Sequence, residues 1–88
     1  MKIEFKTTFS RDLKKIKDEA LLARVAWVIG EFEIAESLDD ISNLTKLAGY
    51  RHAYRIRIGE YRLGIHAADD TVEFVRFLHR KDIYRKFP

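Results

Sequence analysis

Two short runs of strictly alternating side chains, joined by two residues, constrain the fold of this chain more than any other feature. Residues 54–58 read Tyr-Arg-Ile-Arg-Ile, and residues 61–66 read Tyr-Arg-Leu-Gly-Ile-His. Alternation with a period of two is typical of a β-strand that buries one face. The intervening Gly59 and Glu60 suit a two-residue type II′ turn, because glycine adopts a positive φ without strain. The sequence therefore predicts a β-hairpin with a defined register.

The predicted register gives the hairpin two faces of different chemistry. Arg57 lies opposite Arg62, and Arg55 lies opposite Gly64, whose lack of a side chain we expect to leave that face open. The apolar face, expected to pack under helices, consists of Tyr54, Ile56, Ile58, Tyr61, Leu63 and Ile65. The polar face consists of Arg55, Arg57, Arg62 and His66.

The first half of the chain reads as a strand followed by two helices. Ile3, Phe5 and Thr7 alternate with charged residues, which predicts a half-buried strand. Ser10 is a candidate N-cap for the first helix. Apolar residues at helical spacing predict a second helix over residues 19–37.

The second half reads as a sheet with a short tail. Residues 39–49 show no sustained period and are predicted to form a connector, with Leu44 and Leu47 as its anchors to the core. The dense run of Val, Phe and Leu over residues 71–78 predicts a third strand after the hairpin, and residues 82–87 predict a terminal helix. We therefore expect an α+β fold in which an N-terminal strand and two helices precede a three-stranded antiparallel meander. Residues 1–88 are expected to be one domain.

Charge is distributed unevenly along the chain. Residues 1–50 carry eight basic and nine acidic side chains, whereas residues 51–88 carry nine basic and five acidic ones. A basic C-terminal half favours a polyanionic partner for one face, although ordinary solvated charge is the simpler alternative. The chain has no cysteine, so disulfides and thiolate chemistry are excluded. No signal-peptide core or membrane-spanning run is visible, so we expect a cytoplasmic protein without membrane contact.

The opposed arginines of the hairpin predict an anion site. Like charges directly across two strands cost a few tenths to about 1 kcal/mol of stability unless a carboxylate such as Glu73 offsets them. Guanidinium groups on a rigid sheet donate bidentate hydrogen bonds that match phosphate geometry. Arg55, Arg57 and Arg62 are therefore candidate phosphate ligands.

A second basic segment follows the last predicted strand, where His79, Arg80, Lys81, Tyr84 and Arg85 crowd together. Histidine exchanges protons near neutral pH, and tyrosine can assist beside cations. If the tail forms a helical turn, Arg80 and Tyr84 share a face that we expect to point toward Arg62. The alternative is that His79 caps a backbone carbonyl and that the Tyr84 ring packs on the core. No metal-binding spacing and no glycine-rich phosphate loop occurs, so neither a metal nor another cofactor is expected.

Three segments together resemble the RelE/ParE toxins of type II toxin–antitoxin systems, nearer to RelE than to ParE. These segments are Leu-Ala-Gly at residues 47–49, the hairpin over residues 54–63, and His-Arg-Lys-Asp-Ile-Tyr-Arg at residues 79–85. The resemblance covers nearly the whole chain. It implies a toxin that enters the ribosomal A site, contacts 16S rRNA and cuts mRNA there without a metal. It also implies a cognate antitoxin that wraps the toxin with an amphipathic helix and an acidic segment.

The resemblance also implies roles for individual residues. In the implied reaction the ribose 2′-OH attacks the adjacent phosphate and the 5′-oxygen leaves. Arg55 and Arg57 would lie near the 2′-OH, Arg62 would hold the scissile phosphate, and Tyr84 would stack on a base or assist proton transfer. Arg80 is the corresponding basic residue after the last strand, and Lys81 and Arg85 would contact RNA. Because arginine is a poor general base, His79 is a better candidate for that role than Glu60.

Two other functions remain compatible with the same pattern. One is a ParE-like inhibitor of DNA gyrase, which would share the fold but need no catalytic cluster. The other is an RNA- or protein-binding domain without activity. The set Arg57, Arg62, His79, Arg80 and Tyr84 favours the nuclease.

Overall fold

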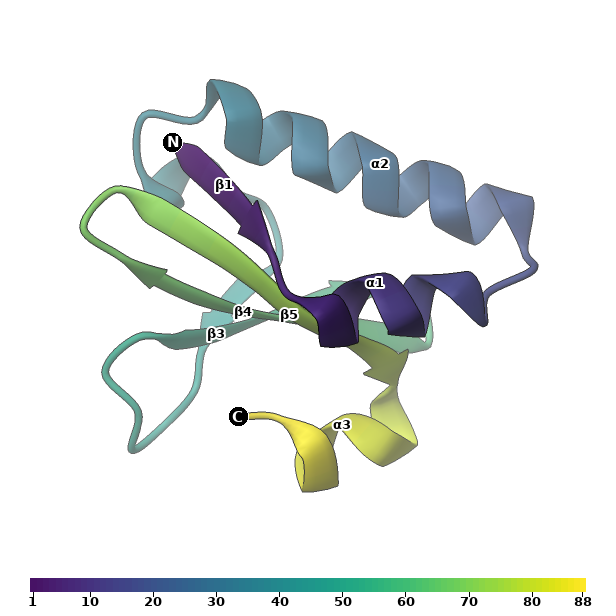
Figure 1. Cartoon of the computed structure of the whole chain (residues 1–88). Coiled ribbons are helices and arrows are strands. Elements are labelled where there is room, and N and C mark those ends of the chain that lie inside the picture. Colours follow the sequence, from purple (N-terminus) through teal and green to yellow (C-terminus); the bar gives the residue numbers. More distant parts are fainter.

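The computed structural model describes all 88 residues and contains one five-stranded mixed sheet with helices on both faces (Figure 1). The strand order is β1-β5-β4-β3-β2, in which β1 pairs parallel to β5 and all other neighbours are antiparallel. The strands are β1 (Lys2–Phe5), β2 (Leu44–Lys46), β3 (Ala53–Ile58), β4 (Tyr61–Ala68) and β5 (Thr71–His79). The helices are α1 (Thr7–Lys14), α2 (Glu19–Ile34), the short 3₁₀ helix η1 (Leu38–Asp40) and α3 (Arg80–Lys86).

The predicted hairpin forms with the predicted register. Arg57 pairs with Arg62 and Arg55 with Gly64 across β3 and β4. Gly59 has a φ of +61°, the conformation that glycine adopts at least cost and that the two-residue turn requires. The α+β class and the antiparallel β3-β4-β5 meander are therefore confirmed.

The helices α1 and α2 cover one face of the sheet, and the main core lies between them and the strands. Its members include the fully buried Phe9, Phe32, Phe74 and Phe77. The second helix begins at the predicted residue, where the Asp18 side chain accepts a hydrogen bond from the backbone N–H of Leu21 (3.1 Å), and it ends at Ile34, before the predicted limit of residue 37.

Two predictions about the connections are wrong. Ser10 is not a cap, because α1 already begins at Thr7, directly after β1. The connector over residues 39–49 contains a strand, β2, which extends the sheet to five strands. Leu44 and Leu47 do pack against apolar clusters, as expected.

A single buried ion pair fastens α1 to the sheet. Asp12 is 5% exposed, and its carboxylate accepts hydrogen bonds from Nε (2.8 Å) and Nη2 (3.1 Å) of Arg76 on β5. It also accepts the backbone N–H of Phe77 at 3.0 Å. Three donors to one buried carboxylate compensate for the loss of its hydration.

The opposite face of the sheet carries α3 and the C-terminal tail. A small apolar cluster of Ala53, Ile83 and Phe87 holds this helix in place. Gly64 on β4 lies directly beneath the Phe87 ring, since a Cβ there would lie 2.7 Å from ring atoms. The prediction that Gly64 leaves the polar face open is therefore wrong, because the tail occupies that space. None of the helices is both long and apolar enough to cross a lipid bilayer.

Candidate RNA-binding site

Three arginines from the predicted polar face line one recess of about 300 Å³. Arg55 and Arg57 come from β3 and Arg62 from β4, and the other lining residues are Asn43, just before β2, and Thr45, within β2. No apolar side chain lines this recess. Side chains two apart on a strand share a face, and register places Arg57 opposite Arg62, so the hairpin holds all three arginines on one surface. We call this surface the arginine recess.

The arginines of the recess make no ion pair with a carboxylate, as the ion pairs of the chain lie elsewhere. Glu73, the carboxylate predicted to offset them, instead lies 3.7 Å from Lys6 and 3.7 Å from His66. Arg62 donates from Nη1 to the carbonyls of Gly59 (3.0 Å) and Tyr61 (2.9 Å). Neutral carbonyls orient its guanidinium without neutralising it, so the recess keeps three positive charges that suit phosphate.

The start of the tail is tied to the hairpin turn rather than to the arginine recess. Arg80 lies with its Nε 2.9 Å from a carboxylate oxygen of Glu60, and its backbone N–H donates to the Glu60 carbonyl at 2.8 Å. Both side chains are more than half exposed. Arg80 is therefore held at the tip of the β3-β4 hairpin and does not line the arginine recess.

His79 is the N-cap of α3. Its Nδ1 accepts the backbone N–H of Lys81 at 3.1 Å, and its ring lies edge-on to that of Tyr61 with centroids 5.5 Å apart. It lines a different small cavity, next to Asp12 and Ile16 of the first helix region, and not the arginine recess. The structure thus gives His79 a backbone-capping contact and does not bring it together with Arg57.

Tyr84 approaches the recess through Arg55. The Arg55 guanidinium carbon lies 5.0 Å from the centre of the Tyr84 ring, within cation–π range. The ring is not packed on the core, because Tyr84 is 70% exposed. The expected common direction of Arg80 and Tyr84 toward Arg62 is not observed, because Arg80 turns to Glu60 and Tyr84 to Arg55.

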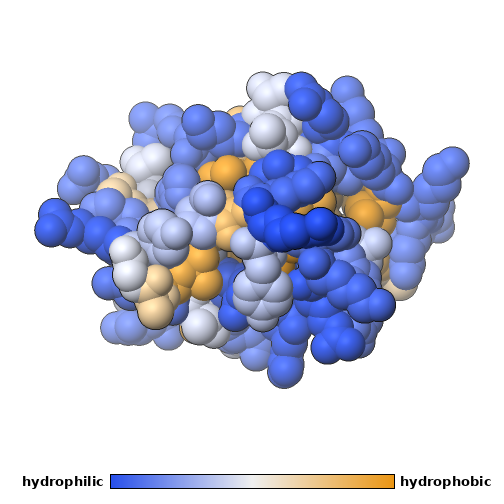
Figure 2. Space-filling view, turned by 90° about the horizontal axis from the view of Figure 1, so that it is seen from below, coloured by the Kyte–Doolittle hydropathy of each residue, from blue (hydrophilic) through white to orange (hydrophobic).

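The remaining basic residues of the tail face solvent. Lys81 is exposed, and Arg85 makes an exposed ion pair with Asp82 at 3.1 Å within α3. Viewed from this side, the surface is dominated by hydrophilic side chains, with apolar atoms in the hollows between them (Figure 2).

Sequence reasoning missed Asn43 and Thr45, which complete the arginine recess. Thr45 pairs with Arg55 in the sheet, and Asn43 adopts a positive φ of 63° just before β2. Three residues of strand are too few to show alternation, so the only available signal was Asn43, a residue type that tolerates this φ.

No group of three His, Asp or Glu side chains comes close enough together to hold a metal ion. The phenol ring of Tyr84 lies beside Arg55, and the Glu60 carboxylate pairs with Arg80. The arrangement concentrates positive charge on a rigid sheet, and its chemical strength is the binding of anions.

Comparison with known proteins identifies the family. A family model described as the ParE toxin of the type II toxin–antitoxin system parDE matches residues 3–84. Toxin RelE3 of Methanocaldococcus jannaschii is 43% identical over 89 residues, which cover all of this chain and all of that protein. The chain belongs to the RelE/ParE toxin superfamily. The RelE3 match supports the RelE-like branch within it.

Solved structures agree with this membership. The RelB–RelE antitoxin–toxin complex of Methanococcus jannaschii matches with a TM-score of 0.82 and 40% identity, covering 97% of this toxin and 99% of that chain. The complex RelBE2 of Mycobacterium tuberculosis matches with a TM-score of 0.68 and 29% identity, covering 90% and 96%. The YoeB dimer of Staphylococcus aureus, at 19% identity and a TM-score of 0.74 over 91% and 97% of the two chains, shows the same fold.

Proposed function

We propose that this toxin is a single-domain endoribonuclease that cuts mRNA in the ribosomal A site and thereby stops translation. The observation that carries the proposal is the arginine recess, whose three guanidiniums have no carboxylate partner. Arg57 and Arg62 lie directly opposite each other and repel, and the ligand best matched to several such arginines is phosphate. A nearby exposed tyrosine adds a surface on which a base can stack.

The proposed reaction is an internal transfer of the phosphate. The 2′-oxygen loses its proton to solvent and forms a bond to the adjacent phosphorus, and the bond from phosphorus to O5′ breaks. O5′ then takes up a proton. Arg57 and Arg62 would stabilise the extra negative charge on the phosphate oxygens, which is the main contribution that fixed donors make to such reactions.

This chemistry needs charge and proton transfer but no metal or other cofactor. Arg55, Lys81 and Arg85 would contact neighbouring phosphates, and Arg80 would join the site when RNA displaces Glu60. His79 would orient α3, because its Nδ1 is already engaged by backbone. The proposed setting is the cytoplasm, with the ribosome and its 16S rRNA as scaffold and a cognate antitoxin as inhibitor, as in the relatives solved as antitoxin–toxin complexes.

A second candidate function is inhibition of DNA gyrase, favoured by the ParE description of the matching family model. A gyrase inhibitor would not need three unneutralised arginines on one sheet face. The arginine recess therefore favours the nuclease.

The experiment that separates the two uses purified toxin and two assays. We expect primer extension on ribosomes programmed with a defined mRNA to show new ends inside the A-site codon, and gyrase supercoiling to proceed unchanged. Inhibited supercoiling together with intact mRNA would show that the toxin inhibits gyrase and does not cleave mRNA.

A further inference from the structure

A second recess adjoins the arginine recess and differs from it in chemistry. It has a volume of about 310 Å³ and is lined mainly by apolar and aromatic side chains. One wall comes from the loop between β2 and β3 and the other from α3 and the C-terminal end, so segments distant in sequence enclose it. Its lining residues are Leu47, Ala48, Tyr50, Arg55, Ile83, Tyr84, Phe87 and Pro88.

Arg55 lines both recesses, so the two share one side chain in their walls. The arginine recess is lined only by polar and positively charged residues, whereas the second recess is lined mainly by apolar residues and two tyrosines. A nucleotide has the same division into an anionic phosphate and a flat, largely apolar base. A cationic side chain shared with a phosphate-binding site therefore points to a single-stranded nucleotide as the occupant, because a purely apolar ligand would gain nothing from Arg55.

Tyr50 is the residue that the proposed function does not use. It is 53% exposed, a high value for an aromatic side chain, and its loop is braced by a hydrogen bond from its N–H to the Leu47 carbonyl (3.3 Å). Gly49, with a φ of +83°, allows the turn that presents it. Exposed aromatic rings on a braced loop are typical stacking platforms for unpaired bases.

We propose that Tyr50 is a base-binding residue of this toxin: it forms, with Tyr84, a pocket for one unpaired base of the RNA strand whose phosphate lies in the arginine recess. The inference rests on the proposed function and adds to it a second subsite. Because the pocket encloses one base, Tyr50 and its neighbours Leu47 and Ala48 would contribute to codon preference.

Binding to uncleavable RNA tests the pocket separately from catalysis. Full-length toxin with isotope-labelled tyrosine rings is titrated with a short single-stranded 2′-O-methyl RNA, and with the same RNA carrying one abasic position. We expect the ring signals of Tyr50 and Tyr84 to shift while those of the half-buried Tyr61 stay in place. We also expect the RNA whose abasic position falls in the pocket to bind about tenfold more weakly than the intact RNA, because the stacking of one base is lost.

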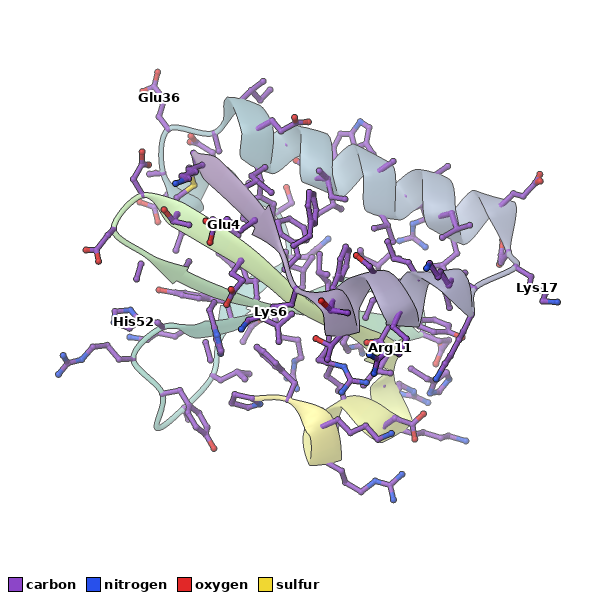
Figure 3. The ribbon with its side chains drawn as sticks, viewed as in Figure 1. Glu4, Lys6, Arg11, Lys17, Glu36 and His52 are labelled. Carbon is purple, nitrogen blue, oxygen red and sulfur yellow. The ribbon has the colours of Figure 1, made fainter.

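Substitutions at Tyr50 provide the decisive comparison. Tyr50→Ala should weaken RNA binding about tenfold or more, and Tyr50→Phe should bind like the parent, because the ring does the stacking. His52→Ala is the matched control, since His52 is exposed on the same loop (Figure 3) but lines neither recess. The same three variants are then compared for cleavage on programmed ribosomes, where Tyr50→Ala should be slower and have an altered codon preference.

Three outcomes would overturn the inference. The first is RNA binding by Tyr50→Ala within twofold of the parent. The second is RNA binding that leaves the Tyr50 and Tyr84 signals unmoved, which would assign the pocket to another occupant such as an antitoxin segment. The third, if free RNA does not bind, is unchanged cleavage by Tyr50→Ala on ribosomes. A parent protein that does not cut mRNA at all would instead sink the proposed function.

Discussion

At the scale of single residues, the chemistry of the site depends on how each arginine is held. Arg62 is oriented by two carbonyls of its own turn, Arg55 lies against the Tyr84 ring, and Arg80 is paired with Glu60. Only the last of these contacts neutralises charge. An arginine that is oriented but not neutralised is ready to bind phosphate, whereas Arg80 must first leave its carboxylate.

The first prediction concerns Arg62. Arg62→Ala should lower the rate of mRNA cleavage by at least about 100-fold, which is the usual cost of removing one donor to a charged transition state. Its free energy of unfolding should change by less than about 1 kcal/mol, because one exposed and one partly buried hydrogen bond are lost while repulsion from Arg57 is relieved. Primer extension and urea unfolding measure the two quantities.

Arg62→Lys is the matched control for charge. Lysine keeps the positive charge but cannot donate a fixed fork of hydrogen bonds, so an intermediate rate is expected. Cleavage by Arg62→Ala at the parental rate, with equal folded protein, would remove Arg62 from the site.

Residue roles could be predicted from the sequence where they followed from strand register, and not where they depended on the tail. The shared surface of Arg55, Arg57 and Arg62 followed from alternation and the two-residue turn. The surroundings of His79 and Tyr84 depend on how α3 docks, which is decided by the contact of Phe87 with Gly64. No local sequence pattern predicts a contact between residues so far apart in the chain.

At the scale of elements, two fastenings hold the helices to opposite faces of the sheet. Asp12 ties α1 to β5 through Arg76, and Phe87 ties the α3 tail to β4 over Gly64. The helices α1 and α3 lie on opposite faces of the sheet (Figure 1), and the contact of Tyr84 with Arg55 places α3 on the face of the arginines. We therefore expect the Asp12 contacts to determine stability and the contact of Phe87 with Gly64 to determine the geometry of the site.

The second prediction concerns the buried carboxylate. Asp12→Ala should lower the free energy of unfolding by about 3 kcal/mol, because it leaves Arg76 and the Phe77 N–H without their partner. Denaturant unfolding followed by circular dichroism measures this change.

Glu4→Ala provides the comparison for an exposed carboxylate. Glu4 extends from β1 (Figure 3) and lies 4.0 Å from Lys2 in an exposed ion pair, so its loss should change the free energy of unfolding by less than about 1 kcal/mol. Equal effects of the two substitutions would show that the Asp12 contacts contribute no special stability.

The third prediction uses two glycines with opposite surroundings. Gly64→Ala places a methyl group 2.7 Å from Phe87 ring atoms, so the tail should be displaced, at a cost of about 1–3 kcal/mol of stability, and cleavage should fall because Tyr84 moves with it. Gly30→Ala, which meets nothing within 4 Å inside α2, should stabilise the protein by about 0.5–1 kcal/mol. Unfolding curves test both substitutions. The NMR signals of the Phe87 ring test whether Gly64→Ala displaces the tail, and unchanged ring signals would contradict the contact between Phe87 and Gly64.

The elements themselves were predictable in proportion to their length. The long helix and the three meander strands followed from the period of their apolar residues, whereas the Asp18 cap of α2 was not predicted. The three-residue strand β2 is too short to show a period and forms only because β3 offers a free edge. Because this strand was not predicted, Asn43 and Thr45 were not recognised as lining residues of the arginine recess.

At the scale of the whole molecule, positive charge without a carboxylate partner is concentrated in the arginine recess. Elsewhere the basic side chains of β5 and α3, such as Arg76, Arg80 and Arg85, are paired with carboxylates. The recess is therefore the surface that attracts polyanions, so both a ribosomal substrate and an acidic inhibitor would approach from that side.

The fourth prediction concerns the antitoxin that we propose as partner. If it covers the arginine recess, its association rate with the toxin should fall by about tenfold or more from low salt to roughly 0.5 M salt, because steering between opposite charges is screened. Stopped-flow mixing at several salt concentrations measures this rate. An association rate independent of salt would mean that another surface guides the encounter.

The most direct test of the central claim is whether the ribose hydroxyl at the cut site is the nucleophile. Ribosomes are programmed with mRNA that is all-ribose, or that carries one 2′-deoxy nucleotide on the 5′ side of the scissile phosphate, and the toxin is added before primer extension. The account predicts cleavage of the ribose mRNA with a 5′-hydroxyl on the downstream product, and no cleavage at the deoxy position. Equal cleavage of both messages would contradict it, because an attack by the 2′-oxygen on a phosphate bound in the arginine recess would then not be the reaction.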